Sequence, residues 1–210
     1  MEVAHRKIRC FAVTLLLLAL SSGNALAATR YVSLASGSPT PPYTNWSTAA
    51  TNIQDAVDAS SPGDEVVVTN GLYSVGGRAI LGTMTNRVAV DRPVFVHSVN
   101  GAEATVIQGY RTPGSGDAVG AIRCVYLTNG AALSGFTLTN GATSYVATEG
   151  GGGAFCETAA VISNCTICGS SATWFGGGVV GGSLTNCILK GTPQAWVAEL
   201  MPARYMPACW

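Results

Sequence analysis

The sequence repeats one nine-residue pattern in three segments, LSGFTLTNG at 133–141, ISNCTICGS at 162–170 and LTNCILKGT at 184–192. The segments align without gaps, and their first residues lie 29 and 22 residues apart. A glycine block precedes each of the last two segments, GGGAF at 151–155 and GGGVV at 176–180. Repeats with periods of about 20–50 residues are typical of solenoids, in which each repeat forms one coil.

Each segment is apolar at its first, fourth and sixth positions. The step of two residues predicts a strand, whereas the step of three requires a corner between two short strands. This corner holds Gly135, Asn164 and Asn186, and glycine and asparagine enter the left-handed backbone region most easily. Because parallel strands stack about 4.8 Å apart, we expect the amides of Asn164 and Asn186 to form a hydrogen-bonded ladder.

The segments upstream of the repeats predict one helix and several strands. Residues 47–60 predict a helix with Ile53, Ala56 and Val57 on one face, placed to cover the N-terminal end of a solenoid. The predicted strands are 65–68, 87–90, 94–98, 105–108 and 122–127. The sequence therefore predicts an all-β fold, a parallel β-helix (β-solenoid) of about five coils with a short N-terminal capping helix.

The composition excludes several classes of function. Of 210 residues, 26 are glycine and only 10% are charged, against about 25% charged in ordinary soluble domains. Beyond residue 9 the chain is weakly acidic and holds a single lysine, Lys190, so we expect no nucleic-acid partner. A hydrophobic content of 48% disfavours disorder, and no apolar run after residue 20 is long enough to span a membrane.

The N-terminus has the pattern of an export signal. Residues 1–9 are basic, residues 10–20 are apolar, and Ala25-Leu26-Ala27 fits a small-x-small cleavage site. An uncleaved membrane anchor is the alternative, but the apolar run is short for a span. We therefore expect cleavage between Ala27 and Ala28 and a mature protein that is secreted, extracellular or on the outer cell surface.

The pattern divides the chain into four parts: a signal peptide at 1–27, an N-terminal cap segment at 28–63, the coils at 64–191 and an irregular or helical tail at 192–210. Thr192-Pro193 resembles a helix start, which favours a C-terminal capping helix. Alternatively, the tail is unrelated to the repeat and the chain is a truncated or frame-shifted fragment of a longer protein. We favour the second interpretation because only two regular Asn-Cys coils precede the break.

Three stretches carry a resemblance to a known family: IQDAVDA at 53–59, PGDEVVV at 62–68 and GLY at 71–73. They resemble the entrance to right-handed parallel β-helix proteins of the pectate-lyase-like superfamily. The glycine blocks and the Ser/Thr-Asn-Cys repeats resemble its large secreted bacterial members, known as right-handed β-helix repeat or choice-of-anchor proteins, and more distantly the polymorphic outer-membrane proteins. The resemblance covers about residues 50–191 and implies a right-handed parallel β-helix. It implies no single activity, because such folds include lyases, hydrolases, esterases and adhesins.

Three aspartates lie at spacings close to one coil: Asp64, Asp91 and Asp117 follow one another by 27 and 26 residues. If stacked, they would suit a lyase that holds Ca²⁺ between carboxylates, or an inverting hydrolase with carboxyl groups ~6.5–9.5 Å apart. The arginines within reach are Arg87, Arg92 and Arg123. The favoured alternative places each aspartate in a turn, and none of the family's catalytic motifs is present. Asp91, Asp117, Arg92 and Arg123 are the catalytic candidates.

The cysteines favour a structural interpretation. Six remain after the signal peptide: Cys124, Cys156, Cys165, Cys168, Cys187 and Cys209. Cys165 and Cys187 occupy the repeat position of Phe136, so we expect them in the apolar core. The Cys165-x-x-Cys168 motif lacks the following helix of a redox site and the second pair of a zinc site. A disulfide at Cys156 or Cys168 is the alternative.

These observations favour a non-catalytic module that binds extracellular polysaccharide or a cell surface. The alternative is a polysaccharide lyase or glycoside hydrolase, and Ca²⁺ is expected only in the lyase. We otherwise expect no cofactor and no metal. Tyr43, Trp46 and Tyr145 are the aromatic candidates for stacking on sugar rings. His97 has no Ser or Cys partner in the sequence pattern that would make a catalytic triad.

Overall fold

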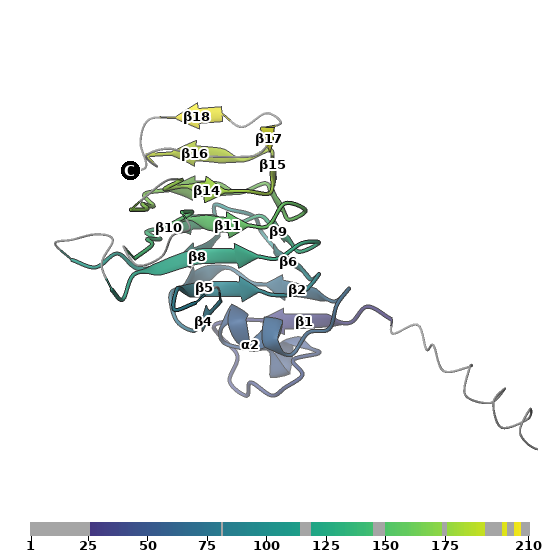
Figure 1. Cartoon of the computed structure of the whole chain (residues 1–210). Coiled ribbons are helices and arrows are strands. Elements are labelled where there is room, and N and C mark those ends of the chain that lie inside the picture. Colours follow the sequence, from purple (N-terminus) through teal and green to yellow (C-terminus); the bar gives the residue numbers. More distant parts are fainter. Residues whose placement is uncertain are drawn as a thin grey trace, which may run out of the picture.

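The protein is described by a computed structural model (Figure 1). The described residues are 26–80, 82–113, 119–144, 150–173 and 176–191, together with the backbone of 199–200 and 204–206. Their strands form three sheets that are mainly parallel, and the one α-helix is short. This arrangement is consistent with a β-solenoid.

Sheet A holds β1 (Thr29–Val32), β2 (Glu65–Val68), β6 (Phe95–Ser98), β9 (Ala132–Ser134), β12 (Val161–Ser163), β15 (Ser183–Thr185) and β17 (Glu199–Leu200). Sheet B holds β3 (Gly71–Tyr73), β7 (Thr105–Gln108), β10 (Thr137–Thr139), β13 (Thr166–Cys168), β16 (Ile188–Lys190) and β18 (Arg204–Met206). Sheet C holds β4 (Arg78–Ala79), β5 (Thr85–Val90), β8 (Ile122–Leu127), β11 (Ala154–Cys156) and β14 (Val179–Val180). The pair β4–β5 is antiparallel and the other pairs are parallel.

The chain visits the three sheets in a fixed order. It passes from sheet A to B to C and returns to A, as in β6, β7, β8 and then β9, and we call one such passage a rung. Each strand pairs in register with its equivalents in the rungs on either side, so successive rungs are stacked (Figure 1). The strands predicted at 65–68, 105–108 and 122–127 are confirmed, and those predicted at 87–90 and 94–98 are observed at 85–90 and 95–98.

The corner between sheets A and B has the predicted backbone. Gly135, Asn164 and Asn186 have φ values of 79°, 52° and 50°, all in the left-handed region. Asn186 Nδ2 donates to Asn164 Oδ1 over 2.7 Å, and Asn164 Nδ2 donates to Ser134 Oγ over 3.1 Å. The predicted ladder is therefore confirmed, and it runs through three successive rungs.

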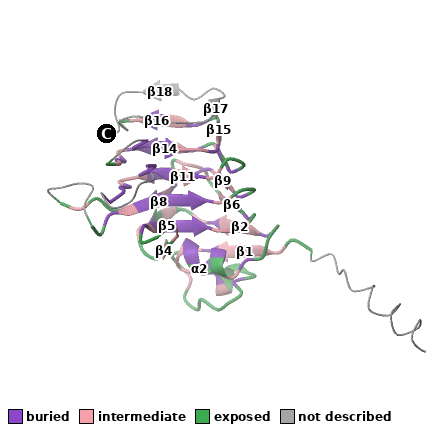
Figure 2. Ribbon diagram, in the orientation of Figure 1, coloured by how far each residue is buried: buried purple, intermediate pink, exposed green. Residues whose placement is uncertain are grey.

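The core lies between the three sheets, where buried residues recur at registered positions from rung to rung. Figure 2 colours the buried residues of the ribbon purple. Leu133, Ile162 and Leu184 are registered partners in sheet A and are buried. At the neighbouring corner the backbone N–H of Phe136 lies 3.4 Å from Cys165 Sγ, and the N–H of Ile188 donates to the Cys165 carbonyl. Phe136, Cys165 and Cys187 are all buried, which confirms the prediction for the two cysteines.

The N-terminal helix is shorter than the predicted span of 47–60. The structure has a 3₁₀ helix η1 (Trp46–Thr48) and an α-helix α2 (Ile53–Asp58). The break has a clear cause: Ala50 exchanges backbone hydrogen bonds with strand β1, and the Asn52 side chain then caps α2 by accepting from the Asp55 N–H. The buried apolar residues of α2 pack beside β1 and β2 of sheet A and β5 of sheet C, and Figure 2 shows the helix at this end of the stack.

The sheets continue beyond residue 191. β17 pairs with β15 and β18 pairs with β16, both in parallel. This corrects the expected irregular or helical tail for the residues of these two strands. Residues 192–198, where the alternative of a C-terminal capping helix would begin, lie outside the described residues.

The described cysteines are of two kinds. Cys124, Cys156, Cys165 and Cys187 are buried free thiols, whereas Cys168 is disulfide-bonded. Cys165 and Cys168 are therefore not bonded to each other, and the Cys-x-x-Cys motif does not form a redox pair. Cys10 and Cys209 lie outside the described residues.

The corner ladder makes a testable contribution to stability. In Asn164→Ala the corner loses both its side-chain hydrogen bonds and a residue that tolerates positive φ, whereas Asn164→Gly loses only the hydrogen bonds. We expect Asn164→Ala to lower the free energy of unfolding by about 1–2 kcal/mol more than Asn164→Gly. Urea denaturation measures both, and equal losses would contradict the role of the left-handed corner.

The free thiols provide a second test. Burial raises the pKa of Cys124, Cys156 and Cys165 to about 12 and also raises that of Cys187. Because the thiolate is the reactive form, iodoacetamide at pH 8 should leave all four unmodified in the folded protein and label all four in urea. Peptide mass spectrometry identifies the sites, and rapid labelling of any of them in the folded protein would show that the core opens there.

Candidate functional site

Asp64 belongs to the turn that precedes β2. Its carboxylate accepts hydrogen bonds from the backbone N–H groups of Ala28 and Ser61, both at 2.8 Å, and pairs with Arg30 at 3.1 Å. Burial opposes ionisation, but these three groups together outweigh it and hold the pKa of Asp64 below its ordinary value. Only 5% of the side chain is exposed, so its position fits the structural interpretation.

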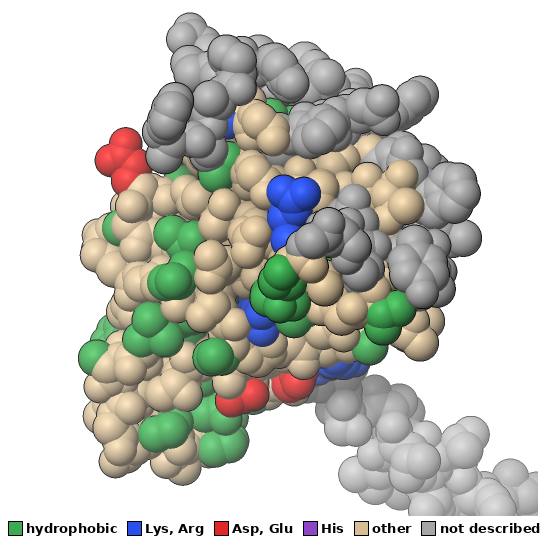
Figure 3. Space-filling view, turned by 90° about the vertical axis from the view of Figure 1, so that its left-hand side faces the viewer, with side chains coloured by type: hydrophobic (Ala, Val, Ile, Leu, Met, Phe, Trp, Pro, Cys, Tyr) green, Lys and Arg blue, Asp and Glu red, His purple; other side chains and the backbone are tan. Residues whose placement is uncertain are grey.

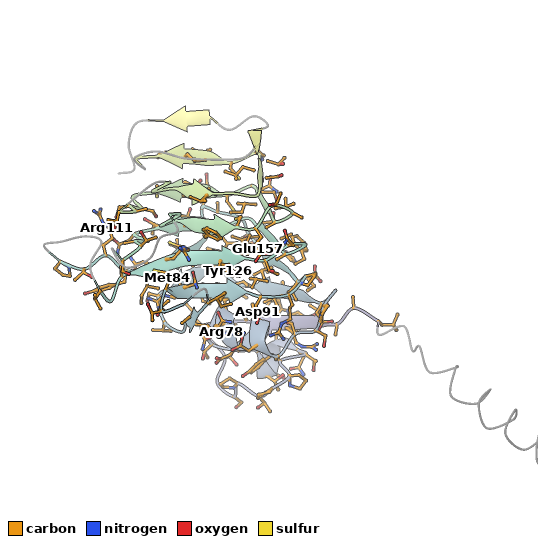
Figure 4. The ribbon with its side chains drawn as sticks, in the orientation of Figure 1. Arg78, Met84, Asp91, Arg111, Tyr126 and Glu157 are labelled. Carbon is orange, nitrogen blue, oxygen red and sulfur yellow. The ribbon has the colours of Figure 1, made fainter. Side chains whose placement is uncertain are left out.

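Asp91 directly follows β5, at the corner where the chain passes from sheet C to sheet A. The Thr128 N–H donates to the Val90 carbonyl and the Glu157 N–H to the Leu127 carbonyl, which continues the sheet ladder past the strand ends. Asp91, Thr128 and Glu157 therefore form a column in three successive rungs, which we call the corner column (Figure 4). Two rung steps of about 4.8 Å separate the backbones of Asp91 and Glu157 by roughly 10 Å.

The corner column is held by a dense set of contacts. Glu157 accepts hydrogen bonds from the Tyr126 hydroxyl at 2.6 Å, Thr128 Oγ1 at 2.9 Å and the Asn129 N–H at 2.9 Å. Tyr126 also stacks on Phe155 with ring centroids 6.1 Å apart. The hydroxyl is buried beside Glu157, and burial first, then the carboxylate, raise the pKa of Tyr126 to about 12.

Asp91 is bound by two arginines. Arg92 Nε donates to Asp91 over 2.9 Å, and Arg78, from β4, also pairs with Asp91. Arg78 bridges to Asp58, the last residue of α2, at 2.9 Å, and Arg92 donates to the Ser60 carbonyl at 2.8 Å. Burial opposes ionisation of Asp91, but the arginines outweigh it and lower its pKa. These contacts tie the capping helix to sheet C.

The corner column aligns two carboxylates, Asp91 and Glu157, but does not give them the proton chemistry of a catalytic pair. Hydrogen bonds from Tyr126 and Asn129 lower the pKa of Glu157, and the pKa of Asp91 is lowered as well. Both groups are therefore ionised near neutral pH, whereas a glycosidase needs one carboxyl with a raised pKa as its acid. Among the described residues no group of three or more His, Cys, Asp and Glu could hold a metal ion.

Arg123 and Arg87 hold loops. Arg123 is fully buried and donates to the carbonyls of Gly150 and Gly151 and to Asn86 Oδ1, all within 3.0 Å. Arg87 donates to the carbonyls of Gly76 and Gln108, and burial lowers its pKa. These contacts account for Arg123 without a catalytic role. Asp117 lies outside the described residues.

Both arginines lie where sheet B passes to sheet C. The connections between these sheets include 114–118, 145–149 and 174–175, which lie outside the described residues. Figure 3 faces this edge, and its Lys and Arg side chains lie within the face while Asp and Glu side chains lie toward its margins.

The spacing of 26–27 residues did not find the corner column. Asp64 accepts the Phe95 N–H at its carbonyl and so aligns with the start of β6, not with the residue after β5. The loops from sheet B to sheet C differ in length, so equivalent residues are not equally spaced. The signal that could have found Glu157 is the end of each sheet C strand, because the next residue enters the column.

The outer face of sheet A carries two columns of registered side chains that are partly or fully exposed. One column holds Thr29, Glu65, Phe95, Ala132, Val161 and Ser183, and the next holds Tyr31, Val67, His97, Ser134, Ser163 and Thr185. Alternation along each strand places them on one face and the buried core residues on the other. We call these two columns the sheet A face.

Aromatic rings lie at the N-terminal end of the sheet A face. Phe95 is 41% exposed, and its ring stacks on His97 with centroids 4.9 Å apart. Tyr31 contacts Trp46, itself 45% exposed, with centroids 4.5 Å apart. Glu65 lies between the two pairs and contacts His97 Nε2 at 2.8 Å. Tyr31, Phe95 and His97 lie on strands, Trp46 lies on η1, and Glu65 supplies a polar group beside the rings. Of the predicted aromatics, Tyr43 is buried and Tyr145 lies outside the described residues.

No family model matches the chain, and neither a curated protein nor a solved structure matches it. Among the described residues, no helix is long and apolar enough to cross a membrane.

The buried pair of Asp64 and Arg30 predicts a pH dependence of stability. A carboxyl whose pKa is lowered by folding stabilises fully above its unfolded value of ~3.9, and this stabilisation is lost as the pH falls through the folded pKa. We expect Asp64→Asn to lower the free energy of unfolding at pH 7 by about 3 kcal/mol relative to the wild type. Urea unfolding from pH 7 to pH 2 should show this difference shrink below pH ~4, and a difference independent of pH would rule out the charged pair as its source.

Proposed function

We propose that the protein is a non-catalytic module that binds polysaccharide through the sheet A face. The observation that carries the proposal is two aromatic contacts at one end of this face, Phe95 with His97 and Tyr31 with Trp46, in which Phe95 and Trp46 are exposed. The apolar faces of sugar rings pack well against such rings, and the polar groups beside them can hydrogen-bond hydroxyls. Val67, Ala132 and Val161 extend the apolar surface across further rungs.

The shape of the face supports an extended ligand. Its columns cross six strands, from β1 to β15, so the same side-chain positions recur at each rung. A polymer offers repeated groups to such a surface, and several weak contacts along it add to a useful affinity. A small, isolated ligand would instead favour a deep and enclosed pocket.

The finer identity belongs to the same proposal. The parallel sheets and the repeat motifs support a right-handed parallel β-helix of the pectate-lyase-like superfamily. The basic and apolar N-terminal segment supports export with cleavage after Ala27, which would place the binding face outside the cell. A polysaccharide of the surroundings or of a cell surface is then the partner that the sheet A face would meet.

A polysaccharide lyase or hydrolase is the second candidate, favoured by one observation. The corner column aligns Asp91 and Glu157 two rungs apart at one corner of the stack, and a pair of carboxyl groups is the catalytic set of most glycosidases. The lowered pKa values of both groups and their saturation by Tyr126, Arg78 and Arg92 weigh against it.

The binding proposal predicts the effect of removing one ring. Phe95→Ala should weaken binding to a recognised polysaccharide by about tenfold or more, because the ring supplies exposed contact area without supporting the core. Tyr110→Ala is the matched control, since Tyr110 is 43% exposed but lies at the edge between sheets B and C. Affinity electrophoresis against a panel of soluble glycans, with thermal unfolding as the check on stability, measures both.

The same panel distinguishes the enzyme. Reducing ends and unsaturated products are followed with and without Ca²⁺ for the wild type, Asp91→Ala and Glu157→Gln. Turnover that these variants abolish would contradict the non-catalytic proposal, and equal binding by Phe95→Ala and the wild type would contradict the assignment of the sheet A face.

A further inference from the structure

A groove opens where the strands of sheet A end. It has a volume of about 420 Å³ and is lined by Ser33, Leu34, Ala35, Thr69, Asn70, Val99 and Asn100. This volume lies in the range of sites for small molecules, ~300–1,000 Å³. The backbone ladder continues through it, because the Thr69 N–H donates to the Val32 carbonyl and the Val99 N–H to the Val68 carbonyl. The groove therefore crosses three successive rungs.

The groove continues the sheet A face. Ser33, Thr69 and Val99 each lie two residues beyond Tyr31, Val67 and His97 of the second column, about 7 Å along the strand. Alternation gives side chains two residues apart the same side of a strand. The groove and the rings of the sheet A face thus lie on the same side of sheet A, so one polymer chain can contact both.

The lining is uncharged but can hydrogen-bond in both directions. None of its seven residues carries a charge. Asn100 Nδ2 donates to Asn70 Oδ1 over 2.8 Å, and this bond fixes both amides. Asn70 Nδ2 and Asn100 Oδ1 make no hydrogen bond to another described residue, so the pair offers a free amide NH2 group as donor and a free carbonyl oxygen as acceptor. Leu34 and Val99, 43% and 51% exposed, supply apolar surface beside them.

The geometry points to a subsite for a neutral sugar unit, formed by the amides of Asn70 and Asn100 between Leu34 and Val99. A donor and an acceptor side by side suit adjacent hydroxyls, and the apolar walls suit the C–H face of the ring. An acidic sugar would find no cation in the groove and would meet the Glu65 carboxylate on the sheet A face. This inference rests on the proposed polysaccharide binding and specifies the ligand as neutral.

Asn70→Asp tests the subsite with little change in shape. The acceptor for Asn100 is kept, whereas the donor to the ligand is lost and a negative charge is added. Asn164→Asp is the matched control. It adds the same charge to the corner ladder of Asn186, Asn164 and Ser134, and it likewise keeps the acceptor oxygen for Asn186. Ala35→Phe is a second variant, which fills the groove without charge.

The measurement is affinity electrophoresis of the full chain in gels with a soluble neutral glycan or with polygalacturonate. We expect the wild type to prefer the neutral glycan, and Asn70→Asp and Ala35→Phe each to weaken that binding about fivefold or more, with Asn164→Asp unchanged. Binding that depends on Phe95 but not on Asn70 or Ala35, or that prefers polygalacturonate, overturns the subsite and leaves the proposed function standing. Absence of binding to every glycan overturns the proposed function itself.

Discussion

The fold depends on backbone hydrogen bonds between parallel strands that stay in register from rung to rung. Short strands of three or four residues cannot hold a sheet alone, so each gains its stability from the rungs on either side. Register requires every rung to turn at the same place. The left-handed residues Gly135, Asn164 and Asn186 supply that turn between sheets A and B, and the amide ladder ties the turns to one another.

Register also explains how the charged groups are used. A stack of similar turns leaves few irregular places, and three of the acids, Asp64, Asp91 and Glu157, occupy such places at the ends of strands. Asp64 closes the turn before β2, and Asp91 joins Arg78 and Arg92 beside the capping helix. Glu157 organises the next corner through Tyr126. Because a carboxylate held by several donors has a lowered pKa, these groups stabilise the corners as anions and are poorly suited to transfer protons.

The same stacking builds surfaces. Alternation along a strand separates core from outer face, and registration repeats each outer position at every rung. Phe95, Val161 and the second column of sheet A thereby form one continuous face, although they come from distant parts of the sequence. The groove beside Asn70 and Asn100 arises similarly, since it follows the ends of three neighbouring strands.

The sequence alone determined the parallel β architecture, most of the strands, the left-handed corner and the burial of Cys165 and Cys187, because these follow from local periodicity and from residues with special backbone preferences. The helix predicted from the sequence is longer than the observed one. Ala50 makes backbone hydrogen bonds with the β1 segment, and local helix propensity does not predict these bonds. The pairing of Asp91 with Arg78, the column with Glu157 and the two surfaces of sheet A were decided only by the tertiary structure. Loops of unequal length between sheets B and C set which residues meet, and that registration depends on contacts across the rungs, not on spacing along the chain.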